Sequence, residues 1–136
     1  MAWKSLLYLL FLASLAWPVA AEHEIYYRYT VLGYVQDARG VPQRGVTVSL
    51  TREKTGFSYR AETDAAGLYM IVARIGDEGA GERLRLAAGE QSVVLVARFD
   101  PGNHAQERGT RLDFHGGRSV ERTDWFLATL RRVVAE

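Results

Sequence analysis

The sequence contains no cysteine, and only three histidines occur among its 136 residues. Without cysteine the chain has no disulfides and no thiolate-ligated metal, so its stability must rest on a hydrophobic core. The histidines, His23, His104 and His115, lie far apart and form no His-x-x-x-His pair, so their spacing predicts no zinc site. There is also no glycine-rich phosphate loop and no haem-attachment cysteine. The sequence therefore predicts no metal and no cofactor.

A charge excess of either sign is also lacking, because 17 basic residues face 16 acidic ones and the formal net charge is +1. No run of arginine or lysine is long enough to form a patch for a polyanion. We therefore expect no nucleic-acid partner.

One long uncharged segment is present, and it stands at the start of the chain. It runs from Ser5 to Ala21, follows the basic residue Lys4 and ends in the small-residue stretch Pro18–Ala21. This pattern predicts a secretory signal peptide over residues 1–21, cleaved after Ala21, and export to a periplasm or beyond. An uncleaved anchor is the alternative, but the apolar core is shorter than the roughly 20 residues that span a bilayer. Membrane contact is expected only through this segment, or weakly through the C-terminal segment.

Residues 22–122 have the pattern of one all-β domain. Val46, Val48 and Leu50 alternate with polar residues, the period of two that gives a strand one buried face. Similar stretches predict about seven strands: 25–36, 46–51, 57–63, 68–74, 83–86, 93–99 and 110–114. Asp64 and Gly67 occupy the first and fourth positions of a type I turn, which predicts a hairpin between the third and fourth of these strands. The fourth strand is expected to be central in its sheet.

Two motifs in this region resemble the carboxypeptidase regulatory-like domain family. They read Gly33-x-Val35-x-Asp37-x-x-Gly40-x-Pro42-x-x-Gly45-Val46-x-Val48 and Thr63-Asp64-x-x-Gly67-x-Tyr69. The resemblance implies an antiparallel, transthyretin-like or Ig-like β-sandwich. It also implies a non-catalytic module of the kind that accompanies peptidases, envelope receptors and other secreted proteins.

The last segment, residues 123–136, has a different period. Phe126, Leu127, Leu130, Val133 and Val134 fall on one stripe of an amphipathic helix. A final β-strand is the alternative, as the resembled fold would have it. The stripe is expected to pack on its own domain, and a membrane surface or a partner's groove stays open as another place for it.

Four polar residues of the last third are the candidate partner-binding residues: His104, Arg111, Asp113 and His115. Strand parity places the last three on one outer face. An exposed Arg111–Asp113 ion pair without a binding role would explain the same pattern. Such a pair would contribute less than about 1 kcal/mol to the stability of the protein. The loop 76–81, with three glycines and two carboxylates, leaves cation binding open, although it lacks the EF-hand spacing.

No catalytic device is predicted. Ser119 follows two glycines and stands in no Gly-x-Ser-x-Gly elbow, so Asp113, His115 and Ser119 do not predict a hydrolase. The transthyretin fold has an enzyme branch, the hydroxyisourate hydrolases, whose C-terminal Tyr-Arg-Gly-Ser motif is replaced here by residues 133–136. Such an enzyme would need His104, His115 and an arginine to converge in one cleft.

We therefore expect an exported, non-enzymatic binding or scaffolding module of the bacterial envelope. Its partner is expected to be another envelope or secreted protein, met through an edge strand or the C-terminal stripe. The alternative is a carbohydrate-binding module that uses exposed Tyr26, Tyr34 or Trp125 as a sugar platform.

Overall fold

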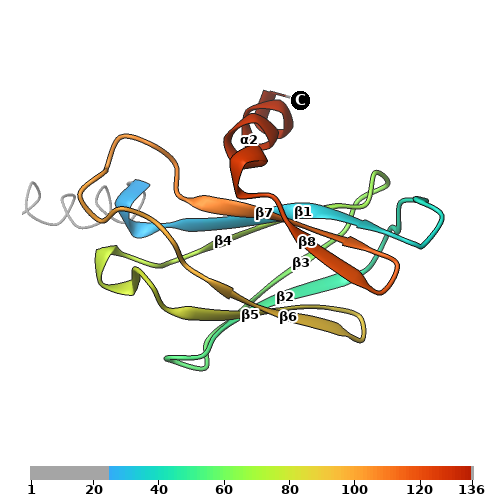
Figure 1. The fold of residues 1–136 in the computed structure, drawn as a ribbon, viewed down its shortest axis with the longest axis horizontal. Coiled ribbons are helices and arrows are strands. Elements are labelled where there is room, and N and C mark those ends of the chain that lie inside the picture. The colour runs from blue at the N-terminus through green and yellow to red at the C-terminus, as the bar shows by residue number, and fades with distance from the viewer. Residues whose placement is uncertain (1–24, 136) are drawn as a thin grey trace, which may run out of the picture.

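The computed structural model of the chain describes residues 25–135. It has two four-stranded sheets packed face to face, with one helix on the outside (Figure 1). The first sheet has the order β4-β1-β7-β8 and the second has the order β3-β2-β5-β6. The predicted signal peptide and its cleavage site lie outside the described residues. No described helix is long and apolar enough to cross a membrane.

The strands of the first sheet are β1 (Tyr29–Gln36), β4 (Leu68–Ala73), β7 (Gly109–His115) and β8 (Arg118–Glu121). The strands of the second sheet are β2 (Thr47–Arg52), β3 (Ser58–Glu62), β5 (Arg83–Ala88) and β6 (Gln91–Val96). The described residues also form one α-helix, α2 (Phe126–Ala135). They contain three short 3-10 helices: η1 (Ile25–Tyr27), η2 (Asp77–Gly79) and η3 (Thr123–Trp125). The predicted all-β sandwich with a C-terminal helix is confirmed.

The core lies between the two sheets and follows the period of two. Val48 and Leu50 of β2 lie beside Leu84 and Leu86 of the neighbouring strand β5, and all four side chains are fully buried. From the first sheet, Tyr69 of β4 and Phe114 of β7 pack into this core. Burying apolar surface at about 25 cal/mol per Å² is the main force that holds the sheets together.

Three local predictions were wrong. Residues 25–28 were assigned to the first strand, but β1 begins at Tyr29 because its partner β4 ends at the paired residue Ala73. The fourth strand is an edge strand rather than a central one. Strand β8 was missed because its single apolar residue, Val120, and three polar neighbours are all exposed and carry no amphipathic pattern.

The hairpin between the third and fourth strands was also wrong, although its turn is present. Gly67 N donates to Asp64 O at 2.9 Å, and Leu68 N donates to Asp64 Oδ1 at 3.0 Å. The strands on either side then separate: β3 pairs with β2, and β4 pairs with β1 in the other sheet. The turn therefore links the two layers of the sandwich.

One strand pair, β1 with β7, is parallel, and it carries a local irregularity at Gly33. A Cβ atom on Gly33 would lie 1.8 Å from the carbonyl oxygen of Leu112. That carbonyl accepts a 2.5 Å hydrogen bond from the buried hydroxyl of Tyr69, whose pKa is raised well above its usual value by burial. The neighbouring amide of Tyr34 donates instead to the side chain of Asp113, at 3.0 Å. Sheet pairing thus fixes the position of the Asp113 carboxylate.

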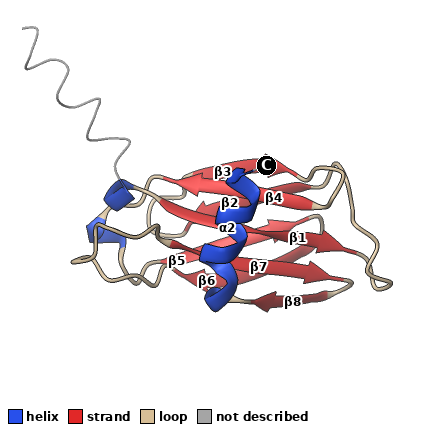
Figure 2. Cartoon of the chain, turned by 90° about the horizontal axis from the view of Figure 1, so that it is seen from above, coloured by secondary structure: helices blue, strands red, loops and turns tan. Residues whose placement is uncertain are grey.

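Helix α2 lies across the outer face of the β4-β1-β7-β8 sheet (Figure 2). Phe126 and Thr129 are its buried residues. Phe126 packs so closely on Gly109 that a Cβ there would lie 2.5 Å from the ring. The helix prediction is therefore confirmed over the alternative of a last strand. Phe126 of its apolar stripe packs on the chain's own domain, whereas Val134 is 69% exposed.

Candidate functional site

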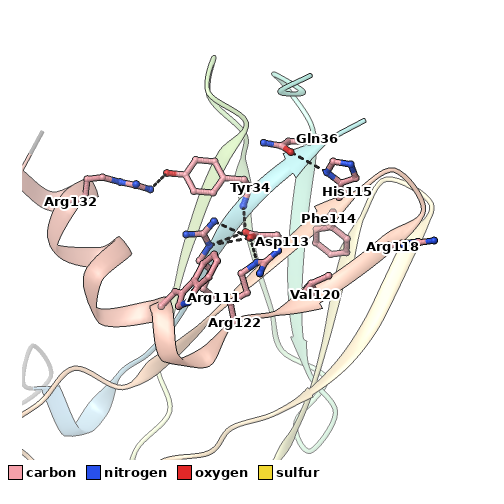
Figure 3. Close-up of a pocket in the computed structure, with 11 residues that line it drawn as sticks. Tyr34, Gln36, Arg111, Asp113, Phe114, His115, Arg118, Val120, Arg122 and Arg132 are labelled. Carbon is pink, nitrogen blue, oxygen red and sulfur yellow. Dashed lines mark hydrogen bonds and ion pairs between the residues drawn. The ribbon is translucent and has the colours of Figure 1, made fainter. Parts of the chain in front are cut away.

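Beside α2, the outer face of the first sheet forms an open groove with a volume of about 500 Å³. We call it the arginine groove. Strands β1, β7 and β8 form its floor, and η3 and α2 form one wall (Figure 3). Its lining residues are Tyr34, Gln36, Arg111, Asp113, Phe114, His115, Arg118, Val120, Arg122, Trp125 and Arg132.

Asp113 is at the centre of the groove's hydrogen bonds. Its carboxylate accepts from Arg111 Nε at 3.1 Å on both oxygens and from Arg122 Nε at 3.1 Å. The backbone amide of Tyr34 donates to the same group. The side chains of Arg111 and Asp113 are only 15% and 14% exposed, so the expected exposed ion pair is in fact largely buried. Removing one partner of such a buried pair lowers the protein's stability far more than removing a surface ion pair does.

The guanidinium groups alternate with the two aromatic rings of the groove. Arg111 lies 5.0 Å from the ring centroid of Tyr34 and 5.3 Å from that of Trp125, while Arg122 lies 4.5 Å from Trp125. At the other side, Arg132 donates to the Tyr34 hydroxyl at 2.6 Å. These cation–π contacts and hydrogen bonds hold Arg111, Arg122 and Arg132 in place.

The groove is strongly positive although the chain as a whole is nearly neutral. Four of its lining residues are arginines, and Asp113 is its one acidic residue. Among the described residues, no carboxylate forms an ion pair with Arg118 or Arg132. Guanidinium groups pair with carboxylates and phosphates through two parallel hydrogen bonds. The groove is therefore suited to a ligand that carries negative charge.

Three of the four candidate residues line this groove: Arg111, Asp113 and His115. Nδ1 of His115 lies 3.2 Å from Oε1 of Gln36. Sequence reasoning did not include Arg118, Arg122 and Arg132, which reach the groove from β8, its continuation and α2. Arg118, Val120 and Arg122 stand at every second position, which was the available signal, but the segment was assigned to a loop.

His104 is not part of the groove. Its Nε2 lies 2.9 Å from Asp77 Oδ2, and the buried Arg108 binds the other oxygen of Asp77. This cluster lies next to the start of β7, whereas His115 lies at its end, about 20 Å away along a seven-residue strand. His104 and His115 therefore do not converge, and the hydroxyisourate-hydrolase alternative loses the geometry it required.

The Asp77 cluster predicts a pH dependence of stability. The hydrogen bond from Arg108, and then His104, lowers the pKa of Asp77 from its usual 3.8. A carboxyl whose pKa is lowered in the folded state stabilises the protein above its unfolded pKa, and this stabilisation disappears as the pH falls through the folded pKa. Asp77→Asn should therefore destabilise the protein at neutral pH, and its difference from wild type should shrink below pH 3.8. Urea unfolding across this range measures the difference.

The exposed Asp124 provides the control. Asp124→Asn should track wild type at every pH. A constant difference between Asp77→Asn and wild type would contradict the assigned role of Asp77.

Neither the loop 76–81 nor the rest of residues 25–135 offers a cluster of metal ligands. No group of three or more histidine, aspartate or glutamate side chains lies close enough to hold a metal ion in this part of the chain. Within the loop, residues 77–79 form η2, and Asp77 is occupied by Arg108 and His104.

No family model matches the chain, and no curated protein matches it. The solved structures that are similar to this chain include three dioxygenases or dioxygenase domains. They are the dioxygenase domain of a dioxygenase carbohydrate-binding protein fusion from Streptomyces sp. SirexAA-E (19% identity, TM-score 0.45), chlorocatechol 1,2-dioxygenase from Pseudomonas putida (10%, 0.47) and 3-chlorocatechol 1,2-dioxygenase from Rhodococcus opacus 1CP (13%, 0.40). The matches cover 65 to 69% of this chain. They span 79% of the first neighbour and about three fifths of the other two.

These neighbours correct one expectation. The resemblance stated above implied a non-enzymatic protein, but all three neighbours are dioxygenases or a dioxygenase domain, and this contradicts that prediction. Identities of 10 to 19% limit what is shared to the fold, so no substrate and no residue role passes from them to this chain.

Proposed function

We propose that this chain is an exported module of the bacterial envelope that binds a negatively charged segment of a partner protein in the arginine groove. The observation that carries the proposal is the charge of the groove, where four arginines surround one aspartate. The signal-peptide pattern supports export, and the resemblance to the carboxypeptidase regulatory-like domain family supports a binding role. An opening of about 500 Å³ lies in the size range of ligand pockets, which suits a short segment of a partner.

A carbohydrate ligand is the second candidate, and the position of two aromatic residues favours it. Tyr34 and Trp125, named above as a sugar platform, line the same groove, and Trp125 is half exposed. The third residue of that platform, Tyr26, has no described side chain. Against a sugar, guanidinium groups lie over both rings, so the ring faces are partly covered.

Crosslinking capture from the native envelope tests the proposal. The tagged chain, expressed with export in its own host, is crosslinked, and the proteins recovered with it are identified by mass spectrometry. The doubly substituted variant Arg118→Gln/Arg132→Gln removes two groove charges without disturbing the Asp113 ion pairs. We expect it to lower recovery of the main partner about tenfold or more.

The control removes two exposed arginines elsewhere, Arg44→Gln/Arg60→Gln, with the same change of charge. It should capture as much partner as wild type. Equal losses in both variants, or no loss in the groove variant, would overturn the proposed function. Retention on glycans with no protein partner would favour the carbohydrate ligand instead.

A further inference from the structure

Strand β8 is an edge of its sheet, and half of its backbone groups point away from the sheet. It pairs with β7 on one side, with Arg118 opposite His115 and Val120 opposite Asp113. The amide of Arg122 then donates to Arg111 O at 2.7 Å, which places residues 118, 120 and 122 in the hydrogen-bonded positions of this antiparallel ladder. Ser119 and Glu121 consequently direct their N–H and C=O groups outward, where no strand of the described chain pairs with them.

The side chains of β8 and the following residue divide into two faces. Arg118, Val120 and Arg122 line the arginine groove at every second position. The Glu121 carboxylate lies on the opposite face, where Thr110 and Thr123 bind it at 2.7 and 3.3 Å. The groove face of this edge therefore reads cation, apolar, cation, with the two arginine positions about 13 Å apart.

The other three edge strands lack this arrangement within the described chain. Strands β4 (Leu68–Ala73) and β6 (Gln91–Val96) contain no charged residue, and β3 (Ser58–Glu62) contains one arginine and one glutamate. Charge therefore distinguishes β8 from the other open edges. Of these edges, only β8 borders the arginine groove.

The same arginines disfavour a second copy of this chain as the partner. If two β8 strands paired antiparallel about Val120, Arg118 of each copy would lie opposite Arg122 of the other. Like charges directly opposite each other destabilise a strand pair. Charge complementarity instead requires carboxylates at both positions and an apolar residue between them.

We propose that β8 accepts an extended acidic peptide of the partner as an added strand, with the pattern acidic-x-apolar-x-acidic facing the groove. The backbone of Ser119 and Glu121 supplies the hydrogen bonds, and Arg118 and Arg122 bind the two carboxylates. Val120 contacts the apolar residue between them. This inference rests on the proposed function, since it specifies how the partner's segment binds in the arginine groove.

Two synthetic peptides of identical composition test the alignment. Thr-Glu-Thr-Val-Thr-Glu-Thr places both glutamates and the valine on one face of a strand, whereas Thr-Glu-Thr-Val-Glu-Thr-Thr places the glutamates on opposite faces. The isotope-labelled chain, produced with export, is titrated with each peptide and followed by NMR. We expect the aligned peptide to bind up to about fivefold more tightly, because only it forms both cross-strand charge pairs. It should also slow amide exchange at Ser119 and Glu121.

Two variants separate backbone pairing from charge. Ser119→Pro removes an outward N–H at an exposed edge position, where proline is tolerated, and should abolish the preference for the aligned peptide. Arg118→Gln should weaken the aligned peptide, while a saturating concentration of that peptide should still slow amide exchange at Ser119 and Glu121. Equal binding of the two peptides, binding of neither, or binding without protection of Ser119 and Glu121 would each overturn the inference. The proposed function is judged separately, by whether capture of the partner still depends on Arg118 and Arg132.

Discussion

Gly33→Ala should destabilise the protein by about 3 kcal/mol or more, among the largest effects of any single methyl group added to this chain. The new Cβ would lie 1.8 Å from the carbonyl oxygen of Leu112, a backbone atom that cannot move without breaking the β1–β7 pairing. The same displacement would disturb the hydrogen bonds from Tyr69 to Leu112 and from Tyr34 to Asp113. Urea unfolding monitored by circular dichroism measures the loss of stability. We expect the variant also to bind the proposed acidic segment more weakly in the arginine groove.

Gly117→Ala is the matched control for this substitution. A Cβ at Gly117 meets no atom within 4 Å, and its backbone does not have a positive φ. The change should therefore leave stability within about 0.5 kcal/mol of wild type. If Gly33→Ala were as stable as Gly117→Ala, this result would contradict the close approach of β1 and β7 at Gly33.

Asp113→Ala should destabilise the protein by about 3 kcal/mol, because it leaves the largely buried Arg111 without its carboxylate. The amide of Tyr34 loses its acceptor in the same step. A lone surface ion pair would give less than about 1 kcal/mol, so the magnitude distinguishes the two cases. Chemical unfolding of this variant beside Asp124→Ala, which removes an exposed carboxylate, provides the comparison.

A double-mutant cycle identifies the cause of this loss. Arg111→Met should also be destabilising, because it removes the bonds of Arg111 to Asp113 and Thr129. The combined variant should lose at least about 1 kcal/mol less than the sum of the single losses, since neither charge is then left buried alone. Strictly additive losses would show that the two side chains do not depend on each other.

These structural roles change how the candidate site is tested. Substituting Arg111 and His115 together would not be a clean test of binding. Because Arg111 bonds to Asp113 and Thr129, that experiment would confuse binding with stability. Arg118 and Arg132 lie in the same groove without ion pairs to described residues, so they are the better substitutions.

The candidate site was only partly predictable for a reason that concerns strand edges. Arg111, Asp113 and His115 lie on one strand, and the period of two was enough to place them on one face. Arg118 lies on a four-residue edge strand that buries no side chain, and Arg122 directly follows it, so no hydrophobic pattern marked this segment as a strand. Arg132 reaches the groove only because α2 folds back over β1 and β7, a contact between residues distant in sequence.

The sequence alone predicts three local features of this protein: the all-β class, the Asp64–Gly67 turn and the C-terminal helix. Each follows from interactions among neighbouring residues, namely side-chain alternation, turn hydrogen bonds and helical periodicity. Only the tertiary structure decided which strands pair, and it separated β3 from β4, joined β1 to β7 in parallel and parted His104 from His115. Strand pairing depends on which distant segments bury their apolar faces together, and the periodicity of any one strand is the same whichever partner it finds.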